Sequence, residues 1–258
     1  MDLYNRVKIE VCINCNSKQS ITDSVSAAFA SKASSVELCS SMEFDGLTPS
    51  APQIIEARNA FTDRKGLMVM IRPRKGDFCY SKMELQLMKG QIRSAAENNA
   101  DGVVFGVLKK DDTIAENQLN QVLELSKELN LISTFHRAFD ATPNFLNSLD
   151  ILIKAGVDRV LTSGTKWQNR QPAVEGIETL REIINHSDNR IELVIGGGIN
   201  KHNVAMILGN LSAQNKWVSV HAYSGVKQNG IVTECAVKEL VKAAQYELNY
   251  TIGNRKKC

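Results

Sequence analysis

Short apolar runs rich in β-branched residues alternate along the chain with longer stretches of helical periodicity. The runs that predict strands cover residues 7–12, 35–39, 67–71, 102–105, 131–136, 159–161, 191–195 and 217–221. Between them, apolar residues recur three and four positions apart, as Leu85, Met88 and Ile92 do, which indicates helices with one buried face. Strands that alternate with helices predict a parallel sheet, because each parallel connection needs a long crossover.

An internal repeat narrows the choice of topology. The second, fourth, sixth and eighth predicted strands are introduced by the similar phrases KASSVEL, NADGVVF, AGVDRVL and NKWVSV. These phrases recur at a spacing of roughly 60 residues, which is two strand–helix units and longer than most solenoid repeats. Eight evenly spaced strands in 258 residues favour an α/β fold, a single TIM-type (βα)8 barrel. The alternative is an open, doubly wound sheet.

The length and composition of the chain are those of one globular domain. The chain can bury one sizeable core, and 43% of its residues are hydrophobic. No Pro/Ser-rich linker or shift in composition marks a second domain, so we expect residues 1–258 to form one domain. Only the basic tail, residues 254–258, is expected to fray in solvent.

Charge and cysteine content limit the classes of partner. Lys and Arg number 31 against 28 Asp and Glu, and this balance argues against a nucleic-acid partner. The N-terminus MDLYNRVKIEVC lacks the apolar core of a signal peptide, and no stretch approaches the ~18 apolar residues of a membrane span. Six cysteines in a chain of this length are not a disulfide framework, so we expect a cytoplasmic protein in a reducing compartment.

The first two predicted strands end in the same pattern, a glutamate and a cysteine two residues apart. Glu10 and Cys12 close the first strand, and Glu37 and Cys39 close the second. Residues i and i+2 of a strand point to one face, so the members of each pair share a face. The carboxyl ends of barrel strands form the functional mouth. We therefore expect two carboxylates in one layer of the interior and two thiols in the next layer towards the mouth.

Other predicted strands also end in polar side chains. Arg72, His136 and His221 occupy such ends, and Asp140 follows the fifth strand closely. Ionised groups at a mouth are costly unless they are paired. We therefore expect Glu10 and Glu37 to face Arg72 and the histidines, above a barrel bottom filled with Val, Ile and Leu. So many polar strand ends favour a functional site, and the alternative is a purely structural network of buried ions.

Glycines and hydroxyls follow the sixth and seventh predicted strands. Gly197 and Gly198 belong to a triple glycine that lets a ligand approach backbone amides closely. Loops in this part of a barrel often bind phosphate, and Thr162 and Ser163 lie in the neighbouring loop. These four residues are candidates for an anion site. The alternative is a tight strand-to-helix turn, with the hydroxyls serving as helix caps.

Two thiols on neighbouring strands suggest a soft metal. Thiolates select Cu(I) and Zn over hard cations. Cys12 and Cys39 come from different strands, so the spacing is not that of a zinc knuckle, and Cys12-x-x-Cys15 has no second pair beside it. A buried cysteine is more often a small hydrophobic residue than a metal ligand. Both interpretations remain open at this point.

The motifs at the strand ends resemble those of the CutC copper homeostasis family. In family order they are IEVC, VELCS, GLTPS, MIRPR, GDF, DGVVFG, TFHRAFD, VLTSG and GGGI, and they cover residues 7 to 221. The departures are Asp45-Gly46 and Lys75-Gly76, where the family commonly has two glycines. Residues 222–230 are covered by no such motif.

The resemblance implies a cytoplasmic TIM-barrel protein of copper handling that assembles as a dimer or a dimer-based oligomer. The family's proposed copper ligands fall in its two Glu-x-Cys motifs, which places Cu(I) at Cys12 and Cys39 here. The resemblance leaves catalysis open. The alternative function is an enzyme that acts on a small anionic or phosphorylated metabolite. Its catalytic candidates are Glu10, Glu37, Arg72, His136, Asp140 and His221.

Overall fold

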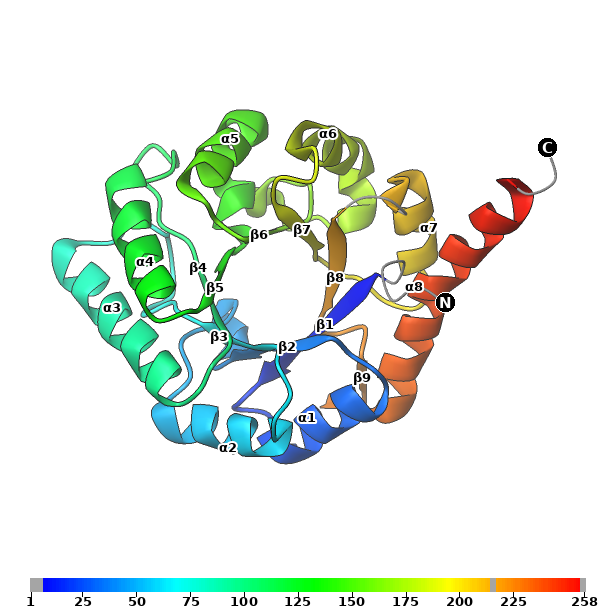
Figure 1. Ribbon diagram of the computed structural model, residues 1–258, viewed down its shortest axis with the longest axis horizontal. Coiled ribbons are helices and arrows are strands. Elements are labelled where there is room, and N and C mark those ends of the chain that lie inside the picture. Colours follow the sequence, from blue (N-terminus) through cyan, green and yellow to red (C-terminus); the bar gives the residue numbers. More distant parts are fainter. Residues whose placement is uncertain (1–6, 214–216, 256–258) are drawn as a thin grey trace.

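The computed structural model describes residues 7–213 and 217–255, with side chains up to residue 245. Eight parallel strands form a closed barrel in the order β1-β2-β3-β4-β5-β6-β7-β8, and β8 pairs with β1 to complete the ring. Figure 1 looks along the barrel and shows the helices as an outer layer around the strands. This confirms the TIM-type (βα)8 barrel and excludes the open sheet.

The strands and helices alternate as the periodicity predicts. The strands are β1 (Lys8–Asn14), β2 (Ser35–Cys39), β3 (Leu67–Met70), β4 (Gly102–Phe105), β5 (Ile132–Phe135), β6 (Arg159–Thr162), β7 (Glu192–Ile195) and β8 (Val218–Ala222). The helices are α1 (Ile21–Ala30), α2 (Ala51–Phe61), α3 (Lys82–Glu97), α4 (Glu116–Glu128), α5 (Phe145–Ala155), α6 (Ile177–Ser187), α7 (Val204–Asn210) and α8 (Glu234–Arg255). Helix α8 includes residues 254 and 255 of the basic tail, and the remainder of the tail lies outside the described residues.

Short elements at the strand ends complete the chain trace. The 3-10 helices with described bounds are η2 (Met42–Phe44), η3 (Arg137–Ala141), η4 (Trp167–Asn169) and η5 (Ala173–Gly176). A small antiparallel hairpin, β9 (Lys227–Gln228) and β10 (Ile231–Val232), lies in the segment that no sequence motif covers. Because parallel strands point the same way, the loops after β1 to β8 gather at one end of the barrel, which is the mouth.

The side chains of each strand alternate between the helical layer and the barrel interior. On β1, Ile9, Val11 and Ile13 belong to the large apolar core that includes the helices. Cys12 belongs instead to a separate small cluster with Cys39, Met68, Met70 and Val104. The period of two along a strand therefore directs the polar and sulfur-bearing residues inward and the β-branched residues towards the helices.

The register between β1 and β2 corrects the layer arrangement expected from the sequence. Cys12 pairs with Glu37, and Asn14 pairs with Cys39, so the two Glu-x-Cys motifs are offset by two residues. The expectation of a carboxylate layer beneath a thiol layer was wrong. Strands in a closed barrel tilt and stagger relative to one another, and this shear cannot be inferred from one strand at a time.

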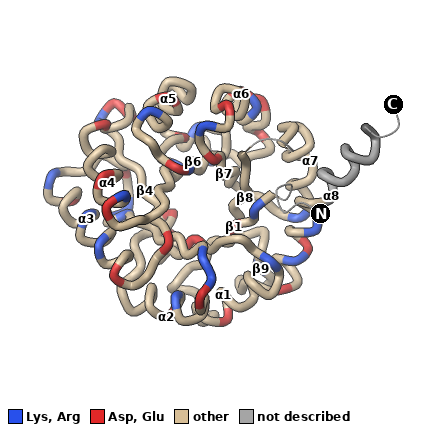
Figure 2. Tube along the Cα trace, viewed as in Figure 1, with Lys and Arg blue, Asp and Glu red and all other residues tan. Residues whose placement is uncertain are grey.

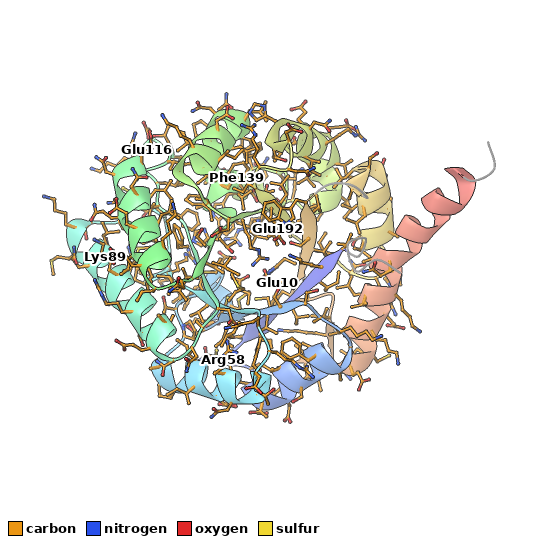
Figure 3. All side chains as sticks on the ribbon, viewed as in Figure 1. Glu10, Arg58, Lys89, Glu116, Phe139 and Glu192 are labelled. Carbon is orange, nitrogen blue, oxygen red and sulfur yellow. The ribbon has the colours of Figure 1, made fainter. Side chains whose placement is uncertain are left out.

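The barrel bottom is polar, which contradicts the expectation of Val, Ile and Leu there. Arg159 at the start of β6 lies 2.8 Å from Glu10 and 3.7 Å from Glu192. Lys8 lies 3.6 Å from Glu192. Figure 3 shows Glu10 and Glu192 inside the ring of strands, whereas Lys89 and Glu116 lie on the helical layer. A paired ionic network therefore fills the interior below the mouth.

The outer surface carries charges of both signs. Figure 2 shows Lys and Arg interspersed with Asp and Glu around the helical layer. Among the described residues, no helix is both long enough and apolar enough to cross a membrane.

Candidate functional site

A cavity of about 210 Å³ opens at the mouth of the barrel. Its walls come from the carboxyl ends of the strands and from the loops that follow them. The lining includes Cys12, Glu37, Cys39, Met42, Met70, Arg72, His136, Arg137, Trp167, Gly197, Gly198, His221 and Tyr223. Glu10 is absent from this lining because it lies one layer deeper, beneath His221. The expectation that Glu10 shares one pocket with Glu37, Arg72 and His136 therefore needs correction for Glu10.

Cys12 and Cys39 bring two thiols together at the wall of the cavity. Their Sγ atoms lie 4.0 Å apart, and each residue is 1% exposed. The hydrogen bond with Cys39 lowers the pKa of Cys12 to about 6, although burial opposes this shift. The Cys12 sulfur and burial together raise the pKa of Cys39 well above its usual value. Cys12 is therefore the more acidic thiol of the pair.

Methionine side chains pack against the thiol pair. The Sδ atom of Met42, on η2, lies 3.9 Å from the Sγ atom of Cys12. Met68 and Met70 from β3 pack in the same cluster. Sequence reasoning missed all three methionines. Met68 and Met70 lie four and two residues before Arg72, so the alternation along the strand could have identified them as inward-facing. Met42 lies in an irregular segment with no periodic signal.

His221 lies between the two glutamates. Its Nδ1 atom is 3.1 Å from Glu10 Oε1 and 3.1 Å from Glu37 Oε2. Burial disfavours the imidazolium, but the Glu37 carboxylate and the bonds to Cys12 and Glu10 raise the pKa of His221 well above its usual value. Burial raises the pKa of Glu37 to about 8, and His221 offsets only part of this effect. A histidine with a raised pKa therefore lies beside the Cys12 sulfur, whose pKa is lowered.

Arg159 is the cation that balances Glu10, and sequence reasoning missed it. Burial alone would raise the pKa of Glu10, but Arg159 and His221 outweigh burial and lower the pKa to about 2. Arg159 opens its strand, so an inspection of strand ends passes over it. The alternation of side chains along the strand could have identified Arg159, because it points this residue into the barrel as it does the polar residues at the strand ends.

Arg72 does not face the glutamates, which corrects the arrangement expected from the sequence. Its guanidinium donates to the backbone oxygens of Phe44, Gly46 and Gly76, at 2.5, 3.2 and 2.9 Å. Arg72 also lies over the ring of Phe78, 5.1 Å from the centroid. Because its two terminal nitrogens bond backbone carbonyls of three residues, Arg72 holds the loops of the mouth in place, and its buried Nε has no hydrogen-bond partner among the described residues.

His136 is a buried imidazole with one unpartnered nitrogen. Its Nδ1 atom accepts a hydrogen bond from the Ala138 amide at 3.1 Å, so the proton of the neutral ring resides on Nε2. Nε2 is buried and has no partner among the described residues. Burial, together with the charge of Arg72, lowers the pKa of His136 to about 3. His136 therefore lines the cavity as a neutral side chain with a free donor.

Asp140, Thr162 and Ser163 form hydrogen bonds with one another. The hydroxyls of Thr162 and Ser163 both donate to the Asp140 carboxylate, as does the Ser163 amide at 3.1 Å. Arg137 lies 2.8 Å from the same carboxylate. None of the three lines the cavity, and Asp140 is fully buried. These groups tie η3 to the end of β6.

Gly197 and Gly198, which follow β7, also line the cavity. Both have left-handed backbone conformations, with φ of 102° and 73°. A Cβ atom at Gly197 would lie 2.9 Å from the Cβ atom of Ser163, so only glycine fits there. The backbone oxygens accept bonds from Ala173, Asn200 and Asn203. Neither glycine amide has a hydrogen-bond partner among the described residues.

Among the described residues, two groups of side chains could hold a metal ion. Cys12, Glu37 and Cys39 form one, and Glu10, Glu37 and His221 form the other, with ligand atoms within 4.8 Å of each other in each group. The second group is already closed by Arg159 and by hydrogen bonds within the group. The first group offers thiol sulfur beside thioether sulfur, which suits a soft metal.

Comparisons with known proteins agree with the fold and with the motifs. The model of the CutC family matches residues 7–222. A CutC family protein of Vibrio cholerae is 40% identical over 202 residues, covering 78% of this chain and 75% of the relative. One of Bacteroides fragilis is 36% identical over 250 residues, covering 96% and 94%. The crystal structure of CutC from Streptococcus agalactiae superimposes with a TM-score of 0.73 at 30% identity, covering 83% of this chain and 98% of that one. This chain therefore belongs to the CutC family.

Proposed function

We propose that this chain is a copper-binding protein of cellular copper homeostasis that holds Cu(I) through Cys12 and Cys39 at the mouth of the barrel. The observation that carries the proposal is the pair of buried sulfurs, 4.0 Å apart, from two different strands. Two sulfurs can bind one ion when they are within about 4.6 Å, taking the Zn–S length as a guide. No movement of the strands is needed.

The donor set supports Cu(I) over harder cations. Thiolate and thioether ligands select Cu(I), whereas structural zinc usually has four nitrogen or sulfur ligands. The apolar neighbours Met68, Met70 and Val104 exclude water from the sulfurs. The crystallised relative from Streptococcus agalactiae is named as a copper homeostasis protein, which also supports this assignment.

The test is a Cu(I) titration of the reduced protein against a competing chelator. We expect wild type to bind one equivalent and Cys12→Ser and Cys39→Ser each to weaken binding by about two orders of magnitude or more, since each variant removes one thiolate ligand. Cys79→Ser is the matched control, because Cys79 lies outside the sulfur cluster. If the double variant of Cys12 and Cys39 binds Cu(I) as tightly as wild type, the copper assignment is wrong.

A second candidate function is an enzyme that acts on a small anionic metabolite. The specific observation is the free Nε2–H donor of buried His136, in a cavity that Arg137 and the unpartnered amides of Gly197 and Gly198 also line. An unsatisfied buried donor is costly, and a ligand oxygen would relieve that cost. Inorganic phosphate and acetate are suitable probes in a calorimetric titration. We expect His136→Phe to abolish their binding, and the absence of binding to wild type would remove this candidate.

We also infer a cytoplasmic location and a dimer or dimer-based assembly, which rest on the family resemblance. Sedimentation velocity of the full chain tests the assembly, and a monomer at all concentrations would contradict it.

A further inference from the structure

Met42 is held over the thiol pair by an anchored segment. It opens η2, between Ser41 and Asp45, whose φ angles of 50° and 64° are both left-handed. Ser40 and Leu47 close the base of the segment with two backbone hydrogen bonds of 2.9 and 2.7 Å. Arg72 holds its far side through the carbonyl oxygens of Phe44 and Gly46. The backbone that carries Met42 is therefore anchored on both sides, and it places the Met42 sulfur 3.9 Å from Cys12 Sγ.

The spacing of the sulfurs matches a three-coordinate site. With metal–sulfur distances of about 2.3 Å, a planar three-sulfur site has sulfurs about 4.0 Å apart, whereas a linear two-sulfur site needs about 4.6 Å. The observed distances are 4.0 Å from Cys12 to Cys39 and 3.9 Å from Cys12 to Met42. The thiol pair is thus too close for a linear ion at that bond length, and the Met42 sulfur lies at the trigonal spacing from Cys12.

Gly46 shows that the segment is built to bring Met42 and Cys39 together. Its φ is 86°, and a Cβ atom there would lie 3.3 Å from Met42 Sδ and 3.4 Å from Cys39 Sγ. The backbone therefore packs directly against both sulfurs on one side. The positive φ favours glycine, and the tight contacts with the two sulfurs add to that preference.

From this geometry we propose that Met42 is the third ligand of the copper site and completes a trigonal sulfur set with Cys12 and Cys39. This inference rests on the proposed function and specifies its coordination. It also assigns a role to η2, whose Met42 closes the site on the side of the cavity. Binding would release the remaining thiol protons to solvent, which leaves the ion with one neutral and two thiolate ligands. This donor set suits Cu(I) and Ag(I) better than Zn²⁺.

The test is X-ray absorption spectroscopy of the full reduced chain loaded with one equivalent of Cu(I). Met42→Leu removes the thioether at nearly constant volume, so folding is expected to be preserved. Met70→Leu is the matched control from the same cluster, and Met83→Leu is a control at an exposed position. We expect three sulfur neighbours in wild type and in both controls, but two in Met42→Leu. Competition with a chelator should show Cu(I) affinity about tenfold weaker for Met42→Leu.

The outcomes separate this inference from the proposed function. Three sulfur neighbours retained in Met42→Leu, or lost in Met70→Leu instead, would overturn the role of Met42 while leaving the cysteine site intact. Copper without sulfur neighbours in wild type would overturn both proposals. Unchanged stoichiometry with one sulfur fewer in Met42→Leu is the result that supports Met42 as the ligand.

Discussion

His136 and Arg159 show how single residues set the electrostatics of the barrel interior. His136 stays neutral because burial and Arg72 lower its pKa. Arg159 is about as buried but stays charged, because Glu10 and Glu192 lie beside it. The two residues differ in their charge state because they lie at different levels of the barrel. His136 follows β5 near the mouth, whereas Arg159 opens β6 in the ionic layer below, where a carboxylate is already present.

The stability of the metal-free protein should depend on pH through His136. The unfolded chain takes up a proton near its ordinary pKa of about 6.5, whereas folded His136 does so only near 3, so acidification favours unfolding. From pH 7 to pH 5 wild type should therefore lose about 2 kcal/mol more than His136→Gln in urea unfolding. His202→Gln, at an exposed position, is the control. Parallel pH curves for wild type and His136→Gln would refute the prediction.

Removal of Arg159 should leave buried carboxylates without a counter-charge. Glu10 and Arg159 are 2% and 8% exposed at the side chain, so little solvent screens the pair. We expect Arg159→Met to lower the free energy of unfolding by about 3–5 kcal/mol at pH 7. Adding Glu10→Gln to that variant should restore part of the loss, because it removes one uncompensated charge. Chemical denaturation of the two variants measures both effects, and a cost below about 1 kcal/mol for Arg159→Met would contradict the pairing.

At the scale of elements, the stagger of neighbouring strands decides which side chains meet. The offset of two residues between β1 and β2 sets Cys12 level with Glu37, yet the two sulfurs converge across the strands. The carboxyl ends of β4 and β5 also lie close together. The His136 amide donates to the Phe105 oxygen at 2.7 Å, which brings the His136 ring onto Gly106.

Gly106 should not tolerate a side chain. A Cβ atom there would lie 2.4 Å from Cε1 and 2.6 Å from Nδ1 of His136, so Gly106→Ala must displace the ring and break its bond with Ala138. We expect a loss of about 1–3 kcal/mol in thermal or urea unfolding. Gly90→Ala is the matched control in α3, where nothing lies within 4 Å. That control should stabilise the protein by about 0.4–1 kcal/mol, and equal effects of the two substitutions would reject the contact.

The whole molecule is held together by the closure of the ring between β1 and β8, so we expect it to unfold as one unit. Its two tryptophans report on opposite ends. Trp167 packs on Phe78 at the mouth, with ring centroids 5.5 Å apart, and Trp217 precedes β8 at the bottom and is 46% exposed. Each can therefore follow one end of the barrel.

Fluorescence of Trp167→Phe and Trp217→Phe should each change in a single step on urea unfolding. Within each variant, the transition should coincide with the loss of far-UV circular dichroism, because every strand depends on both neighbours for its hydrogen bonds. Comparison within a variant removes any effect of the substitution on stability. Separate transitions for the mouth and the bottom would show that the barrel is not one cooperative unit.

Sequence alone determined the barrel and the direction of its strand side chains. The alternation of strand and helix periods predicts the parallel ring, and the period of two predicts that Glu10 shares a face with Cys12 and Glu37 with Cys39, because both depend only on neighbouring positions in the chain. The motifs that identify the family lie at the ends of the same strands.

Only the tertiary structure decided which inward side chains meet. The shear of the closed ring offset the Glu-x-Cys motifs, and Arg159 rather than Arg72 became the partner of Glu10. The left-handed turns around η2 and its contacts with Arg72 carried Met42 onto the thiols. These contacts join strands and loops far apart in the chain. They depend on ring closure and on irregular backbone, and neither leaves a periodic signal in the sequence.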